Sequence, residues 1–200
     1  GRTLTVSSVV NGTGTGLTIN PGVNGLGGTV VLGSGNGANN ITGATTVTGS
    51  QLTLDYITAG SRIDSASSLT LNRSTLLMQG ASTGQAVNGL NLGVGFNQIT
   101  RGGTTALLNV GAINRTSPTG VLNVGAAGFV TTSTANAATG GILGGWAVVN
   151  NTDWATGAGV IGALAAGSYT TVAAGAWPGT TTTGTNANIT GNITAVTGTA

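Results

Sequence analysis

"GTVVLGSGNGANNITGATTVTGSQLTL", residues 28–54, contains the two kinds of segment from which the rest of the chain is built. Val30-Val31-Leu32 and Leu52-Thr53-Leu54 are short apolar triplets, and a cluster rich in glycine and asparagine lies between them. Alternation with a period of two places the outer aliphatic pair on one face of a strand and the middle residue on the other. Glycine and asparagine are typical turn residues. The stretch therefore predicts short, half-buried strands separated by turns.

Similar triplets recur along the chain, mostly with threonine or asparagine in the middle. They are Leu4-Thr5-Val6, Leu17-Thr18-Ile19, Leu69-Thr70-Leu71, Leu90-Asn91-Leu92, Leu108-Asn109-Val110 and Leu122-Asn123-Val124. The intervals between successive triplets are uneven and longer than those of a sandwich or barrel, which would give turn signals every 8 to 12 residues or so. Long, drifting intervals favour a solenoid with coils of variable length. "LNVGA" occurs at 108–112 and again at 122–126, and we expect the two copies to stack in ladders one coil apart.

We therefore predict an all-β protein, a right-handed parallel β-helix, as one structural unit over residues 1–200. The 38 glycines disfavour helix, because each costs roughly 0.5 to 1 kcal/mol relative to alanine inside one. The chain starts at Gly1-Arg2 without a methionine or an apolar signal region, so we expect a fragment of a larger protein. Residues 178–200 are rich in threonine, and we expect further coils there rather than a flexible linker.

Charged residues are few, and they limit the chemistry that the chain can perform. Five arginines and three aspartates give a net charge of +2 without a basic cluster, so nucleic acid is not an expected partner. Cysteine and histidine are absent, and we expect no metal or cofactor. β-Helical polysaccharide lyases and hydrolases need clustered carboxylates. Asp55 and Asp64 could approach one another across a coil with Arg62 or Arg73 nearby, but two acids at this spacing are more often surface ion-pair partners. We predict that the protein is not an enzyme.

Two segments of the chain resemble a known family. Residues 28–54 are similar to the autotransporter-associated β-strand repeat, with matches at Gly28-Thr29, over residues 40–47 and at Leu52; Ile41 replaces an aromatic residue and Ala44 a glycine. Residues 139–171, which include "GGILGGWAVVNNTDWAT" and "GVIGALAAGSYTT", resemble a segment of very large secreted bacterial proteins that carry these repeats. The resemblance implies a right-handed β-helical passenger that is exported to the cell surface or beyond, and it carries over no catalytic residue.

Trp146, Asp153 and Trp154 are the candidate site residues. The two tryptophans and the carboxylate could form a platform for a glycan, with the rings stacked on a sugar face. Alternatively, the tryptophans pack within the solenoid, or they form an interface with another coil or subunit. We favour packing or assembly, since large exposed aromatic rings are unusual unless a partner covers them.

Two further alternatives arise from composition. Residues 155–177 are long enough to span a bilayer, but their glycine, serine and threonine content favours a segment that is not transmembrane. Threonine arrays on a solenoid could bind ice, but coils of drifting length do not give an even lattice.

The function that we predict is that of a non-catalytic structural element of a secreted or cell-surface protein. It would form a stalk, a matrix or a fibre that self-associates through the solenoid ends or the tryptophan region. The alternative is an adhesin module that contacts a glycan or another component of a cell envelope.

Overall fold

A computed structural model describes residues 1–21, 27–33, 38–56, 60–80, 84–103, 105–137, 141–172 and 186–189. Among these residues all regular elements are strands except one short 3-10 helix, η1 (Ala166–Ser168). The strands are β1 (Thr3–Val6), β2 (Asn11–Gly12), β3 (Leu17–Ile19), β4 (Thr29–Leu32), β5 (Asn40–Ile41), β6 (Thr45–Thr48), β7 (Gln51–Tyr56), β8 (Leu69–Asn72), β9 (Thr75–Gly80), β10 (Gln85–Ala86), β11 (Leu90–Leu92), β12 (Phe96–Gly102), β13 (Leu108–Asn109), β14 (Ile113–Arg115), β15 (Val121–Val124), β16 (Val130–Thr132), β17 (Ala147–Val149), β18 (Asp153–Thr156), β19 (Gly159–Val160), β20 (Gly162–Ala163), β21 (Tyr169–Val172) and β22 (Asn186–Ile189).

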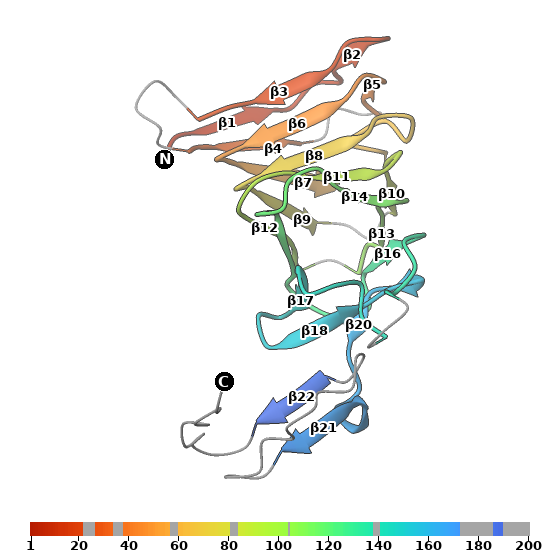
Figure 1. Cartoon of the computed structure of the whole chain (residues 1–200). Coiled ribbons are helices and arrows are strands. Elements are labelled where there is room, and N and C mark those ends of the chain that lie inside the picture. Colours follow the sequence, from red (N-terminus) through yellow and green to blue (C-terminus); the bar gives the residue numbers. More distant parts are fainter. Residues whose placement is uncertain are drawn as a thin grey trace.

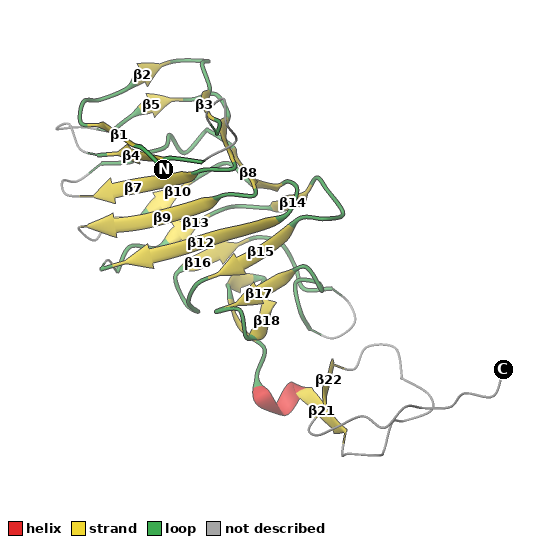
Figure 2. Ribbon diagram, turned by 90° about the vertical axis from the view of Figure 1, so that its left-hand side faces the viewer, coloured by secondary structure: helices red, strands yellow, loops and turns green. Residues whose placement is uncertain are grey.

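The strands wind into stacked coils with three faces (Figures 1 and 2). The largest face is a nine-stranded sheet in the order β1-β4-β7-β9-β12-β15-β17-β18-β20. The second is a five-stranded sheet, β14-β11-β8-β6-β3, and the third contains β2-β5 and the four-stranded sheet β10-β13-β16-β19. Neighbouring strands from β1 to β17 in the first sheet, and all those of the second, pair in parallel. The predicted parallel β-helix is confirmed.

The register shows how much chain each coil takes. In the nine-stranded sheet Thr29 pairs with Gln51, and Gln51 pairs with Thr75, so each coil returns to the same place on this face. In the five-stranded sheet the coil from Leu17 to Thr45 is longer than the coil from Leu69 to Leu90. Coils of variable length are thus observed. However, the apolar triplets do not mark one coil each, because a single coil contributes triplets to different faces.

The expected stacking of the two "LNVGA" copies is wrong. Leu108 lies on the third face and pairs with Val130, whereas Leu122 lies in the nine-stranded sheet between Asn97 and Ala147. The second copy begins before the chain has completed one coil from the first, so the copies occupy successive faces instead of one ladder.

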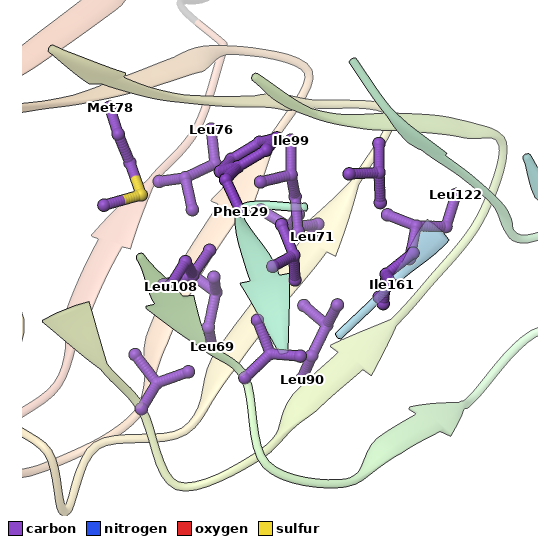
Figure 3. Close-up of a cluster of buried hydrophobic side chains, with 14 of the residues drawn as sticks. Leu69, Leu71, Leu76, Met78, Leu90, Ile99, Leu108, Leu122, Phe129 and Ile161 are labelled. Atoms are coloured by element: carbon purple, nitrogen blue, oxygen red, sulfur yellow. The ribbon is translucent and has the colours of Figure 1, made fainter. Parts of the chain in front are cut away.

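A single hydrophobic core fills the interior between the faces. In the nine-stranded sheet a ladder of buried side chains runs through successive coils as Leu52, Leu76, Ile99, Val124 and Val149. Figure 3 shows Leu76 and Ile99 from this face converging with Leu69, Leu71 and Leu90 from the five-stranded sheet and with Leu108 and Phe129 from the third side. Full burial of such a side chain stabilises the fold by roughly 1.5 to 3 kcal/mol, so stability accumulates coil by coil.

A buried polar ladder replaces strand pairing on the third face between β5 and β10. The Asn39 amide nitrogen donates to the Arg62 carbonyl at 2.9 Å, and its oxygen accepts from Val10 N–H at 2.9 Å. The Gln85 amide oxygen accepts from the Arg62 N–H at 3.0 Å, and its nitrogen donates to the Ile63 carbonyl at 2.7 Å. Side-chain amides thus satisfy the backbone groups that a strand partner would otherwise bind.

Arg62 is buried in this ladder, with 1% of its surface exposed, although arginine side chains are mostly found at the surface. Its Nε donates to the Asp55 carbonyl at 2.6 Å, and its guanidinium lies 5.2 Å from the ring centre of Tyr56. The Tyr56 hydroxyl donates to the Gln85 amide oxygen at 2.9 Å. Burial raises the pKa of Tyr56, and the charge of Arg62 opposes that rise only in part.

Beyond the stack, β21 and β22 pair in parallel, from Tyr169 opposite Asn186 to Val172 opposite Ile189. Of the Thr-rich end at 178–200, residues 178–185 and 190–200 lie outside the described part of the chain. In the segments that the structure describes, we find no helix of the length and apolarity needed to cross a membrane.

Candidate functional site

The tryptophan-rich segment forms the hairpin at which parallel stacking ends. β17 adds to β15 in parallel, with Ala147 opposite Leu122, but β18 folds back on β17 in the antiparallel direction. β20 then pairs antiparallel with β18, and β19 antiparallel with β16 on the third face. β18, β19 and β20 thus cover the last parallel coil, and their antiparallel pairing does not continue the direction of its strands. The antiparallel segment of residues 141–163 is called the terminal hairpin unit below.

Two asparagines form the turn of the hairpin between β17 and β18. Asn150 and Asn151 have φ angles of 53° and 57°, and Thr152 N–H donates to the Val149 carbonyl at 3.1 Å. Positive φ at both central residues is the requirement of a type I′ turn, which asparagine tolerates better than most residues. The Asn151 N–H donates to the side-chain oxygen of Asn123 at 3.0 Å, which ties the turn to the preceding coil.

Trp146 packs against the solenoid. It immediately precedes β17, is partly buried and contacts the hydrophobic core. Its indole lies on Gly144, where an added Cβ would come within 2.3 Å of the indole Nε1. Its carbonyl accepts from Leu122 N–H at 2.8 Å, so the backbone at Trp146 also holds β17 onto β15.

Trp154 points to the outer face and lines a pocket of about 590 Å³. It lies opposite Val148 in the hairpin, and 36% of its surface is exposed. Asp153 lines the same pocket, and so do Leu164 and Tyr169 of the following segment. The structure therefore brings Asp153 and Trp154 together and leaves Trp146 outside the lining of this pocket.

The Asp153 carboxylate is oriented by two hydroxyl donors. Thr152 Oγ1 donates to Oδ2 at 3.1 Å, and the Tyr169 hydroxyl donates to Oδ1 at 3.4 Å. Carboxylate oxygens with free lone pairs can accept from sugar hydroxyls, while the rings of Trp154 and Tyr169 offer flat apolar faces. Such a pocket suits binding of a polar ligand. It holds no second carboxylate among its described lining residues, as the two-carboxylate chemistry of a glycosidase would require.

Sequence reasoning missed Tyr169, Leu164 and Val148 as lining residues of this pocket. Tyr169 is one of only two tyrosines and lies within "GSYTT", so its rarity could have marked it as a candidate site residue. Its proximity to Asp153 was not predictable, since it depends on the chain turning back through β19, β20 and η1.

The other two aspartates are used within the solenoid. Asp55 Oδ2 accepts from the Gln79 side chain of the next coil at 3.2 Å, and Asp64 Oδ1 accepts from Ala66 N–H at 2.8 Å within its own turn. No group of three or more His, Cys, Asp or Glu side chains that could hold a metal ion occurs in the described ranges.

Together, the fold and the pocket define a parallel β-solenoid segment that carries a ligand-accessible surface pocket at its antiparallel end. Among known proteins, the chain is similar to the Adhesin BmaC autotransporter of Brucella suis biovar 1 (strain 1330). The two are 38% identical over 139 residues, 64% of this chain and 4% of the adhesin, so the chain spans only a small part of that protein's length. No family model matches the chain, and no solved structure matches it.

This relative and the stacked parallel coils fit the autotransporter-associated β-strand repeat family to which residues 28–54 are similar. They also support secretion to the cell surface, as for the passenger of an autotransporter.

Proposed function

We propose that this chain is a non-catalytic solenoid segment of an adhesin-like surface passenger, in which it acts as a stalk that holds binding surfaces away from the cell. The observation that carries the proposal is the continuous ladder of buried aliphatic side chains from Leu52 to Val149, which makes successive coils one rigid rod. The adhesin relationship supports a role in attachment, and the structural use of Asp55 and Asp64 supports a non-catalytic one.

Display on cells tests this proposal. The chain would be placed between an export-competent passenger tip and its anchor. A second fusion would lack residues 51–97, which make up two coils. Gln98 then takes the place of Gln51 in the register of the nine-stranded sheet. We expect the deletion to shorten the stalk by roughly 10 Å, since neighbouring strands lie about 4.8 Å apart, and to leave export intact. A stalk whose length does not change, measured by cryo-electron microscopy, would contradict the role as spacer.

The pocket at Trp154 supports a second candidate function, binding of a neutral glycan. The specific observation is the exposed indole beside an oriented carboxylate, at a pocket large enough for one or two sugar residues. A glycan array with the purified chain would test it. Trp154→Ala should abolish any signal, whereas the control Phe96→Ala, which removes another exposed aromatic ring, should retain it.

Self-association through the solenoid ends is a further part of the proposal. Among the described strands β1 is at one end of the nine-stranded sheet, and its Leu4 is 60% exposed in this chain. Unpaired backbone groups at an end of a stack of coils can pair with a further coil of the same protein or with a strand of another chain. Sedimentation of the chain over a range of concentrations should show end-to-end association that Leu4→Lys weakens. Monomers at all concentrations would remove this part of the proposal.

A further inference from the structure

One corner of the solenoid, between the five-stranded and the nine-stranded sheet, becomes longer over three successive coils. The five-stranded sheet aligns Leu71, Leu92 and Arg115, and the nine-stranded sheet aligns Thr75, Gln98 and Asn123. Between these two aligned rows the chain runs over residues 72–74, then 93–97 and then 116–122. The extra residues bulge from the side of the stack. Residues 93–97 and 116–122, with Arg73 and Arg115 beside them, are called the protruding corner below.

Two apolar side chains of the protruding corner face solvent. Val94 is 41% exposed and Phe96 is 52% exposed. Phe96 lies opposite Val121, whereas the next residue, Asn97, lies opposite the buried Leu122, so alternation directs Phe96 outward. The corner is on the side of the stack, where a further coil added at either end would not cover it.

Asn97 fixes the backbone that presents these side chains. It is fully buried, its Nδ2 donates to the Gly95 carbonyl at 2.9 Å, and its Oδ1 accepts from the Ser74 N–H at 3.2 Å. The Val121 N–H of the following coil donates to the same Gly95 carbonyl at 2.9 Å. Because the backbone is held from both neighbouring coils, contact with a partner costs little further ordering.

Two arginines flank Gly95, one from each neighbouring coil. An added Cβ on Gly95 would lie 2.5 Å from the Cγ of Arg73, so the stem of Arg73 crosses this glycine. Arg115 Nε donates to the Gly120 carbonyl at 2.9 Å, beside the strand partner of Phe96, and its guanidinium keeps further N–H donors. Both arginines are exposed, and the segments 71–75, 92–98 and 115–123 contain no aspartate or glutamate. The protruding corner thus combines two positive charges with two exposed apolar side chains.

We propose that the protruding corner contacts the surface of an anionic lipid bilayer. Val94 and Phe96 enter the headgroup region, and Arg73 and Arg115 lie near the lipid phosphates. Binding at a membrane interface combines buried apolar area with attraction to anionic lipid. Each arginine near such a surface strengthens binding by roughly fivefold.

The size and shape of the corner favour a bilayer over a folded protein partner. A stable protein interface buries about 800 Å² on each partner, and Val94 and Phe96, which the fold already covers in part, offer far less. A fluid bilayer accepts a convex corner without a matching cavity, and weak contacts add up when many copies are displayed on one cell. The inference rests on the proposed surface attachment only for this setting, because vesicle binding is a property of the purified chain.

Flotation of the whole chain with lipid vesicles tests the proposal. The probes are vesicles of phosphatidylcholine alone and vesicles of an equal mixture of phosphatidylcholine and phosphatidylglycerol, each at low and at high salt. We expect binding to the mixed vesicles at low salt, and binding to the neutral vesicles that is weaker by about tenfold or more. High salt should weaken binding to the mixed vesicles, because it screens exposed charges.

Phe96→Ser tests the apolar part of the contact. It should weaken binding to the mixed vesicles by about fivefold or more, because it removes the larger apolar anchor. Leu107→Ser is the matched control, since Leu107 is also 52% exposed but lies beside β13 on the third face. It should leave the affinity unchanged.

Variants of the arginines test the charges. Arg73→Gly, which suits the φ of 48°, and Arg115→Gln should each weaken binding by roughly fivefold. Arg115→Lys keeps the charge and should retain most of the affinity. Arg2→Gln removes the same charge outside the corner and should change the affinity by less than about twofold. Circular dichroism checks the fold of each variant.

Four results would each overturn the proposal: no binding to the mixed vesicles, equal binding to the neutral vesicles, an effect of Phe96→Ser no larger than that of Leu107→Ser, or equal losses in Arg115→Lys and Arg115→Gln. None of them bears on the stalk function, which the length of the displayed solenoid tests separately.

Discussion

Leu76 illustrates how single residues hold this fold together. It lies between Leu52 and Ile99 in the buried ladder and is fully enclosed. Each ladder residue contacts its counterparts in the coils above and below, so it stabilises three coils at once. The apolar triplets predicted Leu52 and Val124 of this ladder, because alternation decides which side chains face inward. Leu76, Ile99 and Val149 lie outside the triplets and were not predicted.

Leu76→Ala should lower the free energy of unfolding by about 2 to 5 kcal/mol, because it leaves a cavity that rigid neighbouring coils cannot fill. Leu4→Ala is the matched control, and its effect should stay within about 0.5 kcal/mol because Leu4 is largely exposed. Urea denaturation of both variants gives the comparison. Equal effects would mean that the ladder does not exist.

Tyr56 makes stability depend on pH only in the alkaline range. The folded protein keeps the phenol proton to higher pH than the unfolded chain, whose tyrosines titrate near pH 10 or so. Above that pH the folded state binds more protons than the unfolded state, so the free energy of unfolding falls as pH rises, by up to about 1.4 kcal/mol per pH unit.

Tyr56→Phe should therefore be less stable than the parent at pH 8, because the hydrogen bond to Gln85 is lost, but its stability should fall less steeply from pH 10 to 11. Tyr169→Phe should keep the steep fall. Denaturation curves at each pH provide the measurement, and parallel curves for the parent and Tyr56→Phe would refute the role of Tyr56.

The strands and turns could be predicted from the sequence to different degrees. In the two larger sheets the predicted apolar triplets coincide with β1, β3, β4, β7, β8, β11 and β15, whereas β6, β9, β12, β14 and β17 were not among them. The Asn150-Asn151 turn agrees with turn chemistry. The third face was not predictable as a series of strands, because side-chain amides of Asn39 and Gln85 take over pairing there. Arg62 contacts Asp55 and Tyr56 of its own coil, and its N–H donates to Gln85 of the next coil, which only stacking brings close.

The turn of the terminal hairpin unit should be sensitive to substitution at Asn151. Asn151→Val should destabilise it by roughly 1 to 2 kcal/mol, because a β-branched residue is costly at a φ of 57°. Asn151→Gly, at the same position, should cost little, because glycine tolerates that φ and the N–H donor to Asn123 remains. Hydrogen exchange of amides in β17 and β18 would show the difference. Similar exchange in both variants would contradict the turn geometry.

At the scale of the whole molecule, the described residues form a stack of parallel coils, followed by the antiparallel strands β18 to β20 and then by the parallel pair β21 and β22 (Figures 1 and 2). Composition and triplets predicted the class of fold, but not which triplet lies on which face, because that depends on the number of residues in each corner. Of the candidate residues, Asp153 and Trp154, which are adjacent in the sequence, line one pocket in the structure. The sequence could not separate them from Trp146, whose environment is set by Gly144 and the core.

The register between coils is the central claim, and the absence of cysteine from the chain makes it directly testable. Thr46 and Thr70 are outward partners in the five-stranded sheet, and Asn91 is the next partner of Thr70. A cysteine pair at 46 and 70 should be joined efficiently by a short thiol-specific cross-linker, since adjacent strands lie about 4.8 Å apart. A pair at 46 and 91, two coils apart, should not be joined. Mass spectrometry of peptides from the monomer reads both outcomes. Cross-linking confined to the first pair is the predicted result, and equal cross-linking of both pairs, or of neither, would contradict the stacked parallel coils.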